Sequence, residues 1–175
     1  MRKSLLVLGI VLLATPMFAG SITQNGNIVK AQVAAKCVLV SPFTLDFGSY
    51  DPVVTNAATA LDVATAGANN LQIKCTKNAA FTVDLDNGLS ADVSKTNRFM
   101  KGAGANTLMY NLYTTNARAT VWGSGMTGAA GTTVGGTSAS ALSNTSITVY
   151  GRIPAAQDAA VDATYQDTIV ATINF

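Results

Sequence analysis

Residues 165–175 read YQDTIVATINF, and apolar and polar side chains alternate along them up to the terminal carboxylate. The apolar residues on one face are Ile169, Ala171, Ile173 and Phe175. A period of two residues is typical of a half-buried β-strand. The segment therefore predicts a C-terminal strand whose last aromatic side chain packs into a core.

Similar alternation recurs along the chain, separated by turn-rich gaps and without an amphipathic helix. The alternating stretches are residues 37–47, 71–75, 81–86, 108–112 and 147–153. Several short strands without helices predict an all-β fold, a β-sandwich. Residues 123–146 are rich in Gly, Ser, Thr and Ala. Since a loop of that length without structure is uncommon, we expect a weak edge hairpin near residues 132–134.

The composition argues against an enzyme. The chain has no His and no Glu, and all nine acidic residues are Asp. Acid–base catalysis near neutral pH usually needs His or a tuned carboxylate, and the missing His excludes His-based nucleophile systems and metal sites. We expect neither enzymatic activity nor a cofactor or metal.

The amino terminus has the pattern of a signal peptide. Arg2 and Lys3 precede an apolar run over residues 5–13 that is too short to span a bilayer, and small residues follow. The predicted signal is residues 1–19, with cleavage either between positions 19 and 20 or between 21 and 22. No longer apolar segment follows, so we expect no membrane insertion of the mature chain.

Export would leave a nearly neutral protein. Removing Arg2 and Lys3 from the 11 basic residues leaves nine, against nine acidic ones. No basic stripe remains that could bind nucleic acid. A sparsely charged surface suits packing against other copies of the chain.

Cys37 and Cys75 are the two cysteines of the chain. In an oxidising compartment they are expected to form an intramolecular disulfide. Closing that loop should stabilise the fold by about 3.5–4 kcal/mol. Two free thiols or a redox pair are the alternative, but no C-x-x-C spacing supports it.

Few motifs suggest chemistry. Residues 131–138 have the glycine spacing of a phosphate-binding loop, but Thr137 stands where the motif needs Lys. Asp84 and Asp86 share the polar face of one predicted strand, which favours a solvated face over a calcium site. Trp122 could stack on a sugar but is more often a core or turn anchor.

Residues 29–36 form one further alternating stretch, in which Val29, Ala31, Val33 and Ala35 share a face. Taken alone, this pattern predicts an ordinary first strand that pairs within its own domain, because neighbouring strands usually pair.

Several stretches, taken in order, resemble the spore coat protein U domain family, which includes major subunits of archaic chaperone–usher pili such as Csu pili. The stretches that carry the resemblance are Phe47-Gly48 with Tyr50, Cys75 at a strand end, residues 81–88, 98–100, 108–113, 121–123, 149–154, and 165–175. Ala163 stands where the family usually has Gly.

The resemblance implies an immunoglobulin-like β-sandwich that lacks one strand, with residues 37–175 as the pilin domain. It implies that residues 20–36 are a donor-strand extension whose Val29, Ala31 and Val33 enter the groove of another subunit, in place of the ordinary first strand. The implied partners are other copies or related pilus subunits, a periplasmic chaperone and an outer-membrane usher. Ile169, Ala171, Ile173 and Phe175 are expected to contact the chaperone.

The function implied by the resemblance is a structural subunit of a cell-surface fimbrium, secreted through the periplasm, that serves adhesion and biofilm formation. Two alternatives are a tip adhesin and a spore or cell-surface coat component. A tip adhesin usually carries an additional receptor-binding domain, whereas this chain has one domain and an extension.

Overall fold

The computed structural model describes residues 24, 26, 28–90, 92, 94–126 and 132–175. The predicted signal peptide, residues 1–19, lies outside them. Val33–Phe175 form one compact unit, and the residues up to Gln32 belong to a separate unit. The described residues of that separate unit lie in no helix or strand.

Over the described residues the chain forms ten β-strands and one short 3₁₀ helix. They are β1 (Cys37–Ser41), β2 (Leu61–Ala64), η1 (Gly67–Asn69), β3 (Leu71–Cys75), β4 (Ala80–Leu85), β5 (Arg98–Lys101), β6 (Thr107–Tyr113), β7 (Val134–Thr137), β8 (Thr145–Ile147), β9 (Tyr150–Ile153) and β10 (Ala171–Asn174). None of the described residues form a helix with the length and hydropathy needed to cross a membrane.

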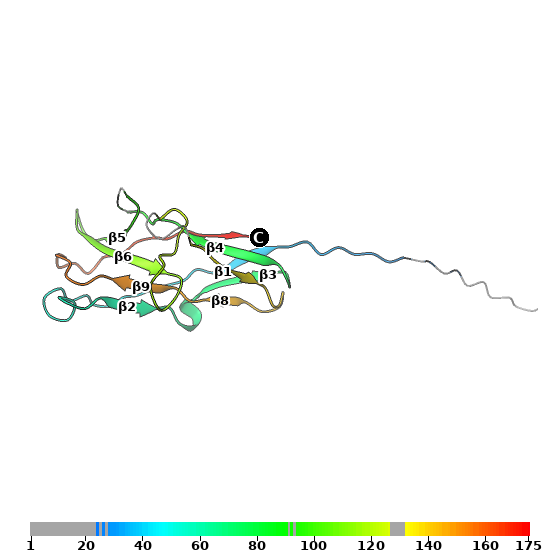
Figure 1. The fold of residues 1–175 in the computed structure, drawn as a ribbon, viewed down its shortest axis with the longest axis horizontal. Coiled ribbons are helices and arrows are strands. Elements are labelled where there is room, and N and C mark those ends of the chain that lie inside the picture. Colours follow the sequence, from blue (N-terminus) through cyan, green and yellow to red (C-terminus); the bar gives the residue numbers. More distant parts are fainter. Residues whose placement is uncertain (1–23, 25, 27, 91, 93, 127–131) are drawn as a thin grey trace, which may run out of the picture. The chain divides into compact units, whose positions relative to one another are not determined.

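The strands form three antiparallel sheets around one core. Their orders are β1-β3-β8, β10-β4-β7 and β2-β9-β6-β5, and Figure 1 shows the last four strands stacked in that sequence. Alternate residues of all three sheets meet in a single apolar cluster, as expected when one face of each strand is buried. Its buried members include Leu71, Ile73, Phe81, Val83, Leu85, Leu108, Leu112 and Ile153. The predicted all-β fold is confirmed.

Two strand predictions need correction. The alternating stretch at residues 147–153 is split between β8, which pairs with β3, and β9, which pairs with β2 and β6. A strand that passes from one sheet to another is a common corner in sandwiches, and alternation cannot reveal it. Near residues 132–134 there is a strand, β7, but it pairs with β4 instead of forming a local hairpin.

The expectation for the final aromatic residue is wrong in this structure. Ile169, Ala171 and Ile173 are partly buried against the core, but Phe175 is 60% exposed. β10 ends at Asn174 and pairs only with β4, so it is the edge of its sheet. No strand among the described residues covers the other side of β10, which leaves its terminal side chain uncovered.

Cys37 and Cys75 are joined by a disulfide. They face each other directly in the register of β1 and β3, so the bond links an edge strand to the strand beside it. Trp122 is fully buried, and its indole Nε1 donates a hydrogen bond to the Val83 carbonyl at 3.0 Å. Its role is the core anchor, not a sugar platform.

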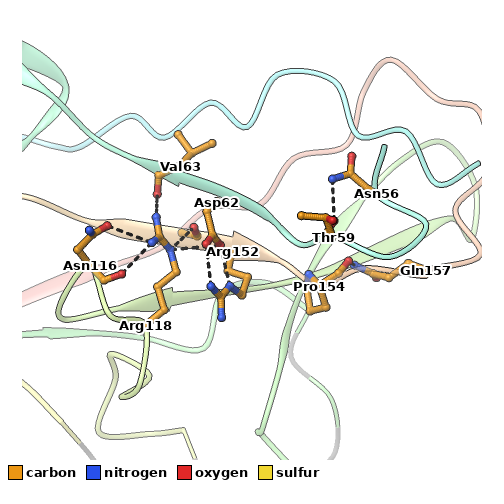
Figure 2. A network of polar contacts seen from close by, with 10 residues as sticks. Asn56, Thr59, Asp62, Val63, Asn116, Arg118, Arg152, Pro154 and Gln157 are labelled. Carbon is orange, nitrogen blue, oxygen red and sulfur yellow. Dashed lines mark hydrogen bonds and ion pairs between the residues drawn. The ribbon is translucent and has the colours of Figure 1, made fainter. Parts of the chain in front are cut away.

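A polar network covers the outer side of β2 and β9 (Figure 2). Arg152 donates to both carboxylate oxygens of Asp62, at 2.6 and 2.7 Å, and Arg118 lies 3.3 Å from the same carboxylate. Arg118 also donates to the carbonyls of Val63 and Gly151, both at 3.1 Å. The network therefore ties the loop that carries Arg118 to two adjacent strands.

Replacing Asp62 with Asn should destabilise the domain in a pH-dependent way. The hydrogen bonds from Arg152, with the charges of Arg118 and Arg152, lower the pKa of Asp62 below its usual 3.8 despite partial burial. A carboxylate with a lowered pKa stabilises the fold above the unfolded-state pKa, and the benefit is lost as the pH falls through the folded-state pKa. Urea unfolding should show a deficit for Asp62→Asn at pH 7 that shrinks below pH 3.8.

The matched control is Asp158→Asn, at an exposed aspartate for which the described structure gives no ion pair. It should show no such pH-dependent deficit. An equal deficit for both variants at every pH would contradict the assignment.

Candidate functional site

The main candidate site is an apolar groove along one side of the domain. It consists of two cavities of about 580 and 680 Å³. Leu45, Phe47, Met100 and Tyr165 line both cavities, so the two cavities adjoin. Apolar grooves with few polar groups are usual binding sites.

The first rim of the groove is residues 42–47, which follow β1. Phe43, Leu45 and Phe47 are partly buried and pack against the core, whereas Thr44 and Asp46 are exposed. This is the alternation of a β-strand, yet these residues lie in no strand. Pro42 interrupts the regular pairing with β3, as expected of a residue without a backbone N–H.

The second rim is residues 165–170, which precede β10. Tyr165 and Ile169 face the core, while Gln166 and Thr168 are exposed. The rim is held from one side only: Gln166 exchanges backbone hydrogen bonds with Lys101, and the Val170 carbonyl accepts from the Asp86 N–H at 3.0 Å. The second rim also alternates like a strand. In the described structure no strand pairs with it on the side that faces the groove.

The two rims run in opposite directions. Residues 39–47 line the first cavity with 165–171, and residues 45–53 line the second with 159–165. At one end of the groove, β1 and β10 approach within 8 Å between Cα atoms, but each is the edge of a different sheet. Edge strands with free backbone groups are templates for pairing with another chain.

The inner side of the groove contains one polar pair. The Tyr110 hydroxyl donates to the Asp167 carboxylate at 2.6 Å, and Phe47 packs edge-on against the Tyr110 ring. Burial, together with the hydrogen bond to Asp167 and its charge, raises the pKa of Tyr110. The phenol is therefore neutral over the physiological pH range and serves as a hydrogen-bond donor to the Asp167 carboxylate.

The groove residues predicted from the sequence are only partly brought together. Ile169 and Ala171 line the groove, whereas Ile173 and Phe175 are not among its lining residues. Val29, Ala31 and Val33 are exposed and lie in no strand, with Val29 at 99% exposure.

The sequence pattern did not identify the groove-lining role of Phe43, Leu45 and Phe47, although their shared parity was visible. Asp167 was also missed. Its role could have been suspected from the alternation of residues 165–175, because Asp167 is polar at a position where that alternation requires an apolar residue. Asp84 and Asp86 accept backbone hydrogen bonds from Ser124, Gly88 and Val170. Within the described residues, no group of three or more side chains could hold a metal ion.

Comparison with known proteins identifies the family. The family model of the Spore Coat Protein U domain matches residues 23–172. The chain belongs to the Spore Coat Protein U domain family. A relative among characterised proteins is "Protein U" of Myxococcus xanthus, which is 32% identical over 172 residues, covering 92% of this chain and 89% of Protein U. The predicted family is confirmed.

Among solved structures, the chain is similar to a chaperone–tip adhesion subunit pre-assembly complex from archaic chaperone–usher Csu pili of Acinetobacter baumannii. The sequence identity is 21% and the TM-score is 0.49. The similarity covers 82% of this chain and 40% of the other, so this chain spans less than half of that structure's chain.

Proposed function

We propose that this chain is a structural subunit of an extracellular chaperone–usher pilus and that it polymerises by donating a β-strand to the next subunit. The observation that carries the proposal is the groove of two adjoining cavities, with large apolar side chains in its lining, between two antiparallel, strand-like rims. In β-strand addition, an extended segment pairs with an exposed sheet edge, and its alternate side chains fill pockets. The two rims offer both features.

The donor segment is residues 28–36 of a second copy. Its alternating small apolar side chains, Val29, Ala31 and Val33, suit a groove already partly filled by the large rings of Phe43 and Phe47. The residues between them, Lys30 and Gln32, would face solvent. Residues 20–36 therefore act as the extension and residues 37–175 as the acceptor domain.

The proposed route is export behind the signal at residues 1–19, capture by a periplasmic chaperone and assembly at an outer-membrane usher. The apolar face of the last strand, with Ile169, Ala171, Ile173 and the exposed Phe175, is the proposed chaperone contact. A chaperone strand there would cover the edge of β10, which otherwise invites aggregation. The mature fibre would lie on the cell surface and serve adhesion and biofilm formation.

A second candidate function is a spore or cell-surface coat component. The 32% identity with Protein U of Myxococcus xanthus, together with the family's description as a spore coat domain, favours this alternative. A coat component could exchange strands through the same groove without forming a long pilus. Electron microscopy of the cell surface, with and without the gene, separates long fibres from a continuous layer.

The proposal is tested by supplying the donor strand in the same chain. Residues 24–36 are appended to Phe175 through a short Gly/Ser linker, since antiparallel neighbours need only a short connection. Filling the groove with two Val and one Ala side chains should raise the free energy of unfolding by about 3–6 kcal/mol. The measurement is urea unfolding, with size-exclusion chromatography to show a monomer.

The matched control carries Asp in place of the appended copies of Val29 and Val33. Its carboxylates cannot be buried without a partner, so it should unfold like the chain without the extension. If the appended strand gave no stabilisation over this control, the acceptor role of the groove would be wrong.

A further inference from the structure

Asp167 breaks the pattern of the second rim. Tyr165, Ile169, Ala171 and Ile173 have the same parity as Asp167 and pack against the core. Asp167 is half-buried like them and lines the groove, yet it carries a carboxylate. A charged residue on the inward face of a strand requires partners that compensate for its burial.

Three donors from separate parts of the chain satisfy that carboxylate. Oδ1 accepts from the backbone N–H groups of Leu89 at 2.9 Å and Thr168 at 2.8 Å, and Oδ2 accepts from the Tyr110 hydroxyl at 2.6 Å. Tyr110 is 4% exposed, so its hydroxyl would be a buried, unpaired donor without Asp167. Asp167 thus connects the rim to β6 and to the turn after β4.

The turn after β4 is shaped around this carboxylate. Gly88 has a positive φ of 72°, and a Cβ atom there would overlap the Asp167 side chain. Only glycine therefore allows this close approach. The same turn gives a second anchor, because Asp86 Oδ1 accepts from the N–H groups of Gly88 and Val170, at 3.1 and 2.9 Å.

We propose that Asp167 is a positioning residue that sets the register of the C-terminal strand on β4. Ile169, Ala171 and Ile173 are similar enough that apolar alternation alone would tolerate a slip of two residues, which keeps the same face inward. In the slip that puts Thr172 opposite Thr82, Tyr165 would take the place of Asp167 beside the Tyr110 hydroxyl, and the Asp167 carboxylate would move to the apolar place of Ile169. Single buried polar residues specify register in this way in other assemblies.

The register decides which side chains the second rim presents to an incoming strand. That consequence rests on the proposed function, whereas the register itself is a property of one subunit. A test within the single subunit therefore separates the two: it can succeed although no fibre forms, and fail although fibres do form.

The test traps the register with engineered disulfides at exposed positions. In the structure, Asn174 lies opposite Thr82, and Thr172 lies opposite Asp84. Asn174→Cys with Thr82→Cys reports this register, and Thr172→Cys with Thr82→Cys reports a slip of two residues. Each pair is introduced into the full chain, and the bonds are identified by mass spectrometry of the peptides.

With Asp167 present, only the 174–82 bond should form. In Asp167→Leu the 172–82 bond should appear in a comparable yield, because the carboxylate no longer opposes the slip. Asp167→Asn should keep the 174–82 bond alone, because its amide oxygen can accept from Leu89 and Thr168 and its NH₂ group can donate to the Tyr110 hydroxyl. Thr168→Val, at the exposed neighbouring position, should also keep it.

If Asp167→Leu does not fold, Asp167→Ala replaces it with the same expectation. Exclusive formation of the 174–82 bond in the folded variant would overturn the proposal, since the register would then be set by the apolar residues alone. A 172–82 bond in Thr168→Val at the same yield would also overturn it.

Discussion

Deleting residues 24–35 should abolish fibre formation while the acceptor domain remains folded. The deletion removes Val29, Ala31 and Val33, the side chains that we propose enter the groove of the next subunit. It removes little from its own domain, because those residues are exposed and lie in no strand. The hydrogen bond that the Thr76 hydroxyl donates to the Ala34 carbonyl is lost, but the β1–β3 pairing and the disulfide remain.

The deletion leaves both candidate signal cleavage positions in place, so export is not altered by design. Electron microscopy of surface fibres measures assembly, and recovery of the subunit with its chaperone measures folding. The matched point variants are Ala31→Asp, which should also stop assembly, and Gln32→Asp, which places the same charge on the outward side and should not. Fibres of normal length from the deletion strain would refute the donor assignment.

Replacing Arg98 with Met should lower the free energy of unfolding by about 2–4 kcal/mol. Arg98 is fully buried at the start of β5. Its Nε and Nη2 donate to the Asp86 carbonyl at 3.0 and 2.6 Å, and Nη2 also donates to the Trp122 carbonyl at 2.7 Å. Met fills similar space but leaves both carbonyls without a donor.

The charge of Arg98 adds to this effect. Burial lowers the pKa of Arg98, while Tyr110 and the carboxylates of Asp86, Asp167 and Asp84 act in the opposite direction. The guanidinium therefore balances the aspartates around the turn after β4. Removing it should leave those carboxylates less well compensated.

The prediction is measured by urea unfolding of the subunit that carries residues 24–36 appended after Phe175. Arg98→Lys should recover part of the loss, because an ammonium can reach one carbonyl but lacks the planar fork that spans two. The control is Arg152→Met, at a more exposed arginine whose ion pair should contribute under about 1 kcal/mol. Equal stability of Arg98→Met and the unmodified chain would contradict the assignment of Arg98 as the organiser of this corner.

Local alternation predicted most of the core strands because one face of each is buried. Residues 71–75, 81–85 and 108–112 lie in β3, β4 and β6, with the predicted side chains inward. β2 and β5 were not predicted from periodicity. The sheet change between β8 and β9 depends on long-range pairing, which local patterns do not contain.

The groove could not be derived from periodicity, because its lining residues come from segments far apart in the sequence. Residues 42–47 and 165–170 each have the pattern of a strand, and only their placement reveals that, among the described residues, neither pairs with a strand on its groove side. The family resemblance supplied that expectation. The roles of Arg98 and Asp167 could not be predicted from the sequence either. Their charges are visible in it, but the carbonyls and the hydroxyl that they contact come from distant turns and strands.

The disulfide between Cys37 and Cys75 would transmit tension if the amino-terminal segment links one subunit to the next. A pulling load on residues 28–36 would enter the domain at Cys37, the first residue of an edge strand. Without the crosslink, the load would peel that strand from its neighbour one hydrogen bond at a time. The covalent bond passes the tension directly to β3, whose Leu71 and Ile73 are fully buried, so a stretched filament would have to break the core before it could unravel.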